Sequence, residues 1–241
     1  MELKRLLSLT RQAIDEYNLI DDGDRIAVAI SGGKDSLTLL YALSELRRFY
    51  PKKFELEAIS VDVGFGMDFG PVQELCDKLD VDFTVVKTQI NTIVFEERKE
   101  SNPCSLCAKL RKGALYKEML KHNCNKVAYG HHKDDFVNTM LLSLFYEGRF
   151  QSLETKFTLD ETNITVIRPL IYVSEQNVIG FKNKYKLPVV KNFCPVDKTT
   201  RREYVATLVR EINKENPGVK DRLFSAVEKQ FLKPLMQNKP E

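Results

Sequence analysis

The sequence predicts an α/β protein with a doubly wound, mostly parallel sheet of about five strands and helices at both ends. Short apolar runs rich in β-branched residues recur at 25–30, 54–63, 81–88 and 125–130, and each is typical of a buried parallel strand. Segments with helical periodicity separate these runs, as in repeated strand–helix units. The length of 241 residues and the hydrophobic content of 43% are sufficient for one large domain.

We expect a single domain over residues 1–241. It comprises an N-terminal helical segment (1–20), an α/β core (21–191), and a cysteine loop with C-terminal helices (192–241). The helix that follows the first strand is expected to end near Tyr50, because Pro51 cannot continue it. The other elements are expected as helices at 1–18, 71–79, 174–185, 199–215 and 217–235, and a strand that ends near 170.

The composition of the sequence argues against a membrane protein and against a secreted protein. No apolar run approaches the roughly 20 residues of a membrane span, and the N-terminus lacks the features of a signal peptide. We therefore expect a cytoplasmic protein with no membrane partner. Five cysteines in such a chain are more typical of metal ligands or redox groups than of disulfides. The net charge of +3 does not by itself indicate a nucleic-acid partner.

The central motif is the turn Ser31-Gly32-Gly33-Lys34-Asp35-Ser36, between the first strand and an apolar helix. The glycines permit close approach of a ligand, and the helix start offers N–H groups to an anion. Serine hydroxyls and Lys34 add further donors. Asp35 would repel phosphate unless a cation lay between them, which indicates Mg²⁺ bridging Asp35 and a pyrophosphate group. The pattern is neither the ordinary P-loop nor the dinucleotide fingerprint. It predicts ATP binding by residues 31–36.

A second polar turn, Gly130-His131-His132-Lys133-Asp134-Asp135, follows the fourth strand and is expected at the same sheet edge. We expect Gly130, His131 and Asp135 to contact the nucleotide, with Asp134 or Asp135 helping to hold Mg²⁺. Helix capping by the two aspartates is the alternative. Asp62, at the end of the second strand, is expected near the adenine.

The cysteines fall into two groups. Cys104 and Cys107 form a CxxC before an expected helix, and Cys194, in a loop, is their natural third partner. Cys76 is expected to be buried, and Cys124, before the fourth strand, is expected in a loop or in the core. A disulfide switch, a zinc site and an iron–sulfur site all remain open for the CxxC. Zinc usually takes four protein ligands, whereas a four-iron cluster held by three cysteines leaves one iron open to another ligand.

The hexapeptide 31–36 resembles the SGGxDS signature of the PP-loop ATP pyrophosphatase superfamily, whose members split ATP into AMP and pyrophosphate. With the CxxC, the turn 130–135, the segment Ile167-Arg168-Pro169-Leu170 and Cys194, the chain is similar to the tRNA 2-thiocytidine synthetase family over about residues 5–230. That family generally carries a second CxxC. Here Lys191 stands where its first cysteine would fall, and only Cys194 is kept. Related uridine thiolases share the architecture, so cytidine and uridine both remain possible targets.

The resemblance implies ATP-dependent tRNA thiolation, with a cytidine of the anticodon loop as the expected target. The C2 carbonyl oxygen attacks the α-phosphate of ATP, pyrophosphate leaves, and sulfide at the open iron of a [4Fe-4S] cluster then displaces AMP. The implied catalytic residues are Lys34, Asp35, Cys104, Cys107 and Cys194, with the three cysteines as cluster ligands and Asp35 on Mg²⁺. The implied partners are tRNA, a sulfur donor (a cysteine desulfurase or sulfide) and a second copy of the chain as a homodimer.

Two alternatives remain open. One is a PP-loop ligase or amidating enzyme that adenylates a small molecule and holds structural zinc in its cysteines. The other is a nucleotide-binding regulatory protein with a CxxC redox switch.

Basic residues flank the cysteines, as an RNA backbone near a sulfur site would require. Solvated helix faces are the alternative for these clusters, and a phosphate contact or a salt bridge is the alternative for Arg168. Tyr116 and Tyr204 are candidates for stacking on an unpaired base. The expected RNA contacts are Lys109, Arg111, Lys112, Arg168, Arg201 and Arg202.

Overall fold

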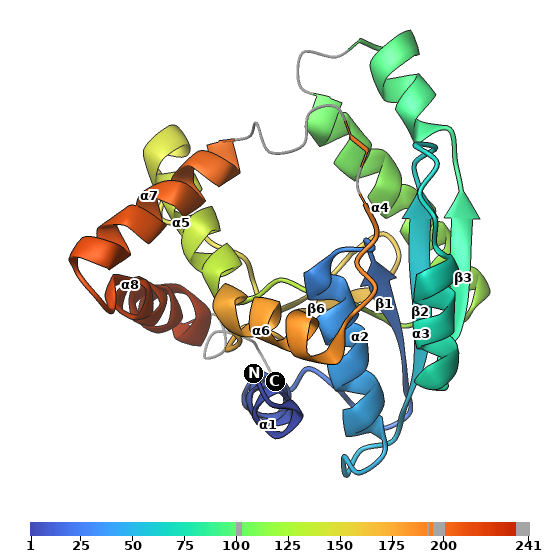
Figure 1. Cartoon of the computed structure of the whole chain (residues 1–241), viewed down its shortest axis with the longest axis horizontal. Coiled ribbons are helices and arrows are strands. Elements are labelled where there is room, and N and C mark those ends of the chain that lie inside the picture. The colour runs from blue at the N-terminus through green and yellow to red at the C-terminus, as the bar shows by residue number, and fades with distance from the viewer. Residues whose placement is uncertain (100–102, 192, 195–200, 235–241) are drawn as a thin grey trace.

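The computed structural model describes residues 1–99, 103–191, 193–194 and 201–234. Its centre is a six-stranded sheet in the order β3-β2-β1-β4-β6-β5 (Figure 1). The strands are β1 (Asp24–Ile30), β2 (Phe54–Asp62), β3 (Asp82–Lys87), β4 (Lys126–Ala128), β5 (Lys156–Thr158) and β6 (Thr165–Ile167). All neighbouring strands are parallel except β5 and β6, which pair antiparallel. The mostly parallel sheet is therefore confirmed, and β5 is an edge strand that the sequence did not reveal.

The strand order reverses between β1 and β4. The chain runs outward from β1 through β2 to β3, then returns to the other side of β1 and continues through β4 to β6. In open parallel sheets, ligands bind beyond the carboxyl ends of the strands at such a reversal. The residues that follow β1 and β4 are the turns 31–33 and 129–132, so the two polar turns flank this point, as the sequence predicted.

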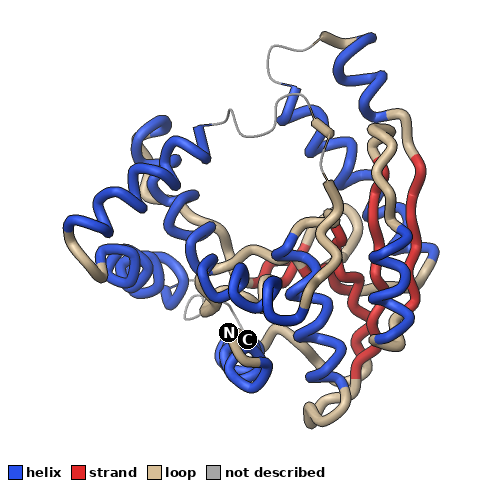
Figure 2. The backbone as a smooth tube through the Cα atoms, viewed as in Figure 1, coloured by secondary structure: helices blue, strands red, loops and turns tan. Residues whose placement is uncertain are grey.

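Helices surround the sheet in two groups (Figure 2). One group lies against the strands, and α5, α7 and α8 pack on one another at the side of the molecule away from β3 (Figure 1). The α-helices are α1 (Leu3–Glu16), α2 (Lys34–Arg47), α3 (Gly70–Lys78), α4 (Pro103–Lys121), α5 (Lys133–Glu147), α6 (Glu175–Tyr185), α7 (Arg201–Glu215) and α8 (Val219–Val227), and short π-helical segments span η1 (Thr92–Glu97) and η2 (Glu228–Leu232).

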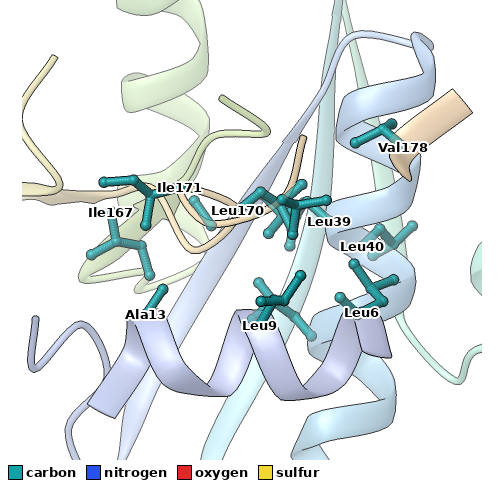
Figure 3. Packing of buried hydrophobic residues seen from close by; sticks show 14 of the residues in the cluster. Leu6, Leu9, Ala13, Leu39, Leu40, Ile167, Leu170, Ile171 and Val178 are labelled. Carbon is teal, nitrogen blue, oxygen red and sulfur yellow. The ribbon is translucent and has the colours of Figure 1, made fainter. Parts of the chain in front are cut away.

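Two hydrophobic clusters hold the sheet in place. In the larger one, Leu6 and Ala13 of α1 pack with Leu40 of α2 and with Ile167 at the end of β6 (Figure 3). In the smaller one, Leu115 and Met119 of α4 pack with buried residues of β1, β2, β4 and β6. Both clusters fix the helices whose N-termini carry the polar motifs. No helix in the described ranges is long and apolar enough to cross a membrane.

Candidate functional site

The turn after β1 presents backbone to the sheet edge. Gly32 has a left-handed backbone (φ +76°), and a Cβ there would lie 2.9 Å from Val190 Cβ. The N–H of Val190, in the segment after α6, donates to the Gly32 carbonyl at 2.9 Å. Gly33 caps α2 without any side-chain hydrogen bond. The turn is thus tied to the segment that leads to Cys194.

The two serines of the turn close a small hydrogen-bonded ring. The backbone N–H of Ser31 donates to Ser36 Oγ at 3.2 Å, and Ser36 Oγ donates to the Gly33 carbonyl at 3.0 Å. The Ser31 and Ser36 hydroxyls also lie 3.2 Å apart. This ring holds the start of α2 in an anion-binding conformation.

Charged groups gather at the first turn of α2. Lys34 Nζ lies 3.0 Å from Asp35 Oδ1 and 3.4 Å from Glu175 Oε1 at the start of α6. Burial lowers the pKa of Lys34, but the neighbouring carboxylates outweigh it and leave the pKa raised, so the amine is a cation. His132 Nε2 lies 3.5 Å from Asp35 Oδ1. The nucleotide phosphates would therefore meet Lys34 together with a carboxylate that suits Mg²⁺.

The turn after β4 packs directly on the turn after β1. A Cβ on Gly130 would lie 2.8 Å from the backbone carbonyl of Asp35, so only glycine permits this approach. Asp135 accepts from the His132 N–H at 2.9 Å and lies 3.7 Å from Arg202 of α7. Burial is the largest influence on Asp135 and raises its pKa. The predicted proximity of the two turns is confirmed.

Asp134 has a structural role. It accepts from the Glu175 N–H at 2.7 Å and from Lys220 Nζ of α8 at 2.7 Å. Burial by itself would raise the pKa of Asp134, and these two donors outweigh it, so the pKa is lowered. Asp134 therefore links α5, α6 and α8.

His131 is held by Arg168. Arg168 Nε donates to His131 Nδ1 at 3.1 Å, and the guanidinium also donates to the Glu154 carbonyl and lies over the Phe157 ring. Arg168 is only 7% exposed, and burial lowers its pKa to about 10. Burial, followed by the charge of Arg168, lowers the pKa of His131 to about 3. The structure therefore places Arg168 behind His131 and not on the surface, and its expected contact with RNA stays a prediction.

One cavity of about 330 Å³ joins the turn 31–33 to the cysteines. Ser31 and Gly33 form one wall, and Cys104, Cys107 and Cys194 form another, with Arg111 beside them. Most of the remaining described lining is apolar, and its apolar wall includes Val61, Val63, Phe65, Met67, Phe69 and Phe95. The three cysteines that the sequence analysis grouped together therefore line the same cavity as the turn 31–33, which was predicted to bind ATP.

The thiols in this cavity are chemically suited to a soft metal centre. The pKa of Cys107 is raised overall, and burial is the largest cause. Arg111 opposes this shift, and the nearby Cys194 and Cys104 thiols add to it. The described wall carries no histidine or carboxylate. Within the described ranges, no group of three or more His, Cys, Asp or Glu side chains is arranged to hold a single metal ion. Thiolates are the usual ligands of iron–sulfur clusters, so the three thiols of this cavity fit such a cluster.

The other predicted residues take different places. Asp62 is not on the described wall of the cavity, although its neighbours Val61 and Val63 are, and it accepts from the Gly64 N–H at 2.9 Å. Lys109, Arg111 and Lys112 are exposed on α4. Arg201 lies over the Tyr146 ring at 4.6 Å. The expected cysteine loop and the expected helices at 199–215 and 217–235 lie partly outside the described residues, which leave out 192, 195–200 and 235–241.

Sequence reasoning missed three parts of the site. His132, buried with only 4% exposure, stands among Asp35, Asp134 and Asp135. Glu175 reaches Lys34 from another helix. The apolar wall comes partly from the Gly-rich segment 64–70 and partly from η1. The alternation of glycines with Phe65, Met67 and Phe69 after β2 was the only signal of that wall.

Comparison with known proteins agrees with this geometry. A PP-loop domain model matches residues 5–212. The tRNA-cytidine(32) 2-sulfurtransferase of Geotalea daltonii is 42% identical over 228 residues, which cover 93% of this chain and 90% of that protein. The enzyme of the same name from Geobacter sulfurreducens is 41% identical over 228 residues, covering 93% and 89%.

Among solved structures, the U34-tRNA thiolase NcsA from Methanococcus maripaludis with its [4Fe-4S] cluster superposes with a TM-score of 0.75, at 22% identity, over 99% of this chain and 81% of that one. This likeness supports the fold of the chain. The chain belongs to the PP-loop family and, within it, to the tRNA-cytidine(32) 2-sulfurtransferases.

Proposed function

We propose that this protein thiolates C2 of a cytidine in tRNA, position 32 by analogy with its relatives, in a reaction driven by ATP. The shared cavity carries the proposal. The turn 31–33, to which we assign phosphate binding, and three thiols line one cavity of about 330 Å³. A base that is activated at the turn 31–33 would meet sulfur at the thiols without leaving the protein.

The chain's own residues supply the activation chemistry. The start of α2 and Lys34 stabilise the charge that develops on the α-phosphate as pyrophosphate departs. We assign Mg²⁺ to Asp35, whose carboxylate faces the same turn. His132, 3.5 Å from Asp35, orients that carboxylate. We expect Ser31, Gly32, Gly33, Ser36, Gly130, His131 and Asp135 to contact the nucleotide, and Asp62 to stay near the adenine.

The sulfur chemistry belongs to Cys104, Cys107 and Cys194. A [4Fe-4S] cluster on three cysteines retains one iron without a protein ligand, and that iron can carry an exogenous sulfur. The described lining of the cavity offers three thiols, one short of the four protein ligands that structural zinc usually takes, which supports this assignment. Burial raises the pKa of Cys107, and Arg111 beside this thiol offsets part of that effect.

The RNA would approach between α4 and α7. Lys109 and Lys112 are exposed on α4, and Arg201 and Arg202 begin α7. The charges of Lys112 and Arg202 both act on His131, so basic groups from the two helices face the same turn. We further propose a cysteine desulfurase or sulfide as sulfur donor and a homodimer, both from the family resemblance, and a cytoplasmic location from the composition of the sequence.

The first test is anaerobic reconstitution with iron and sulfide, followed by metal analysis and nucleoside analysis of tRNA treated with ATP and sulfide. We expect about four irons per chain and ATP-dependent 2-thiocytidine. Cys194→Ala should lose the cluster and the product. Asp35→Asn should keep the cluster and lose the product, because it removes only the proposed Mg²⁺ ligand.

The matched control is Cys76→Ala, which removes a thiol buried in α3 and outside the cavity. It should retain both cluster and product. Stoichiometric zinc in place of iron, or a Cys194→Ala protein that still binds about four irons, would contradict the proposal.

A further inference from the structure

The buried contact between Arg168 and His131 has a consequence for the reaction. Arg168 Nε carries a hydrogen, so the His131 Nδ1 that it contacts at 3.1 Å must be the bare, accepting nitrogen. In a neutral imidazole the proton then resides on Nε2. Among the described residues, none hydrogen-bonds to Nε2. In the His131 ring, Nδ1 thus accepts from Arg168, and the Nε2–H group remains as a donor for a ligand.

The orientation of Arg168 is itself fixed on several sides. Its guanidinium donates to the Glu154 carbonyl and lies 5.3 Å from the Phe157 ring centroid, and its backbone N–H donates to the Thr155 carbonyl at 3.0 Å. Only 7% of the residue is exposed. A guanidinium that is held in this way and has little access to solvent is poorly placed to meet phosphate directly. It is well placed to set the state of the histidine in front of it.

His131 stands where the nucleotide is expected. It follows Gly130, whose backbone packs on Asp35 and the start of α2. The Tyr129 ring lies 5.7 Å from the imidazole and covers another side of it. After burial, the side chains that lower the pKa of His131 are Arg168 after β6, Arg202 of α7, His132 before α5 and Lys112 of α4. All of them disfavour a second proton on the ring.

We propose that Arg168 is a positioning residue, which locks His131 as a neutral Nε2–H donor to an ATP phosphate oxygen. This deepens the proposed function, since it assigns the partner of one site residue. An unlocked neutral ring would spend part of its time with Nδ1 protonated, and its bare Nε2 would then repel the phosphate. The chain would hold one tautomer without placing another charge in the site.

Nitrogen NMR of the free protein tests the tautomer directly. The chain has three histidines, so ¹⁵N-histidine labelling with His122→Gln and His132→Gln variants assigns the spectrum. We expect His131 to show a bare Nδ1 and a protonated Nε2 from pH 5 to 8. Arg168→Met should mix the tautomers, whereas Arg168→Gln, which keeps an N–H donor without charge, should preserve the native pattern.

Kinetics of ATP cleavage supply the second readout. Arg168→Met should lower kcat about 10- to 100-fold and change KM for ATP less. The deficit should shrink as the pH falls from 8 to 6, because a doubly protonated ring regains its Nε2–H. Arg168→Gln should recover most of the rate. A role confined to structure would not depend on pH in this direction.

The outcomes separate this inference from the proposed function. A native His131 spectrum in Arg168→Met, or loss of rate in Arg168→Gln despite the native tautomer, would overturn it. If Arg168→Met does not fold, His131→Gln and His131→Asn replace it. Glutamine places an N–H near the position of Nε2 and asparagine does not, so glutamine should retain more activity. The tautomer of His131 is measured in the free protein, so this result does not depend on which tRNA product the enzyme forms.

Discussion

Gly32 shows how a single residue without a side chain sets the geometry of the phosphate-binding turn. Its left-handed backbone and the 2.9 Å approach of Val190 Cβ leave no room for alanine. We expect Gly32→Ala to destabilise the protein by at least about 1–2 kcal/mol from backbone strain and to raise KM for ATP sharply. Chemical denaturation and steady-state pyrophosphate release measure the two effects.

Gly23→Ala provides the matched control for Gly32→Ala. Gly23 is also left-handed (φ +82°), but a Cβ there meets nothing within 4 Å. Its substitution should show the backbone strain alone, with KM for ATP unchanged. Equal effects of the two substitutions on KM would contradict the role of the Val190 contact.

The residues of the site were predictable where the chain itself carries the pattern. Ser31 to Ser36 and Gly130 stand next to strands, so their chemistry and their common sheet edge followed from local sequence. His132 and Phe95 did not follow, because their roles depend on packing between distant segments. Arg168 was recognised as important, but its burial behind His131 arises only from tertiary contacts.

At the scale of elements, α8 is tied to α5 through an ion pair between the partly exposed Lys220 and the buried carboxylate of Asp134. Lys220 donates to Asp134, whose pKa burial alone would raise above its ordinary 3.8. We expect Lys220→Met to reduce the free energy of unfolding by about 2 kcal/mol at pH 7. This difference should shrink toward pH 5, because an unpaired buried carboxyl has a raised pKa and regains stability as it takes up a proton.

Urea denaturation at pH 7 and pH 5 measures this effect. Lys121→Met is the control, since Lys121 pairs on the surface with Glu118 in the same helix. Exposed pairs of this kind contribute about 0–1 kcal/mol. A Lys220→Met deficit that is the same at both pH values would mean that Asp134 does not titrate in the variant.

The main elements of the fold were also predictable, within the limits of local pattern. The strands β1 to β3 and the helices α1, α2 and α6 agree with the periodicity to within one or two residues at most ends. The edge strand β5 was missed because three residues, Lys156–Thr158, carry too little alternation to stand out. The π-helical segment η1 has no sequence signature, since its hydrogen-bond spacing is a response to packing.

At the scale of the whole molecule, the cysteines divide between core and cavity. Burial raises the pKa of Cys76 to about 12 and that of Cys124 to about 11, whereas Cys104 is exposed. Since the thiolate is the nucleophile, iodoacetamide should alkylate Cys104, Cys107 and Cys194 of the cluster-free folded protein well before the other two.

Mass spectrometry of digested samples follows the five sites separately. A non-hydrolysable ATP analogue should slow the alkylation of Cys107, because nucleotide and thiol share one cavity. Cys76 and Cys124 should react only after denaturation, which makes them internal controls for folding. Early labelling of Cys76, or no effect of the nucleotide on Cys107, would show that the cavity is not organised as described.

The common enclosure of the phosphate-binding turn and the thiols also bears on the efficiency of the reaction. An adenylated base exposed to water hydrolyses back to the original base, and the ATP is then consumed without a product. On the proposed function, the activated base would cross only one cavity of about 330 Å³ to reach sulfur, and an apolar lining would limit its contact with solvent on the way. On the proposed function, the ratio of AMP formed to sulfur inserted should therefore approach one, and the aromatic side chains of that wall would set how closely it does.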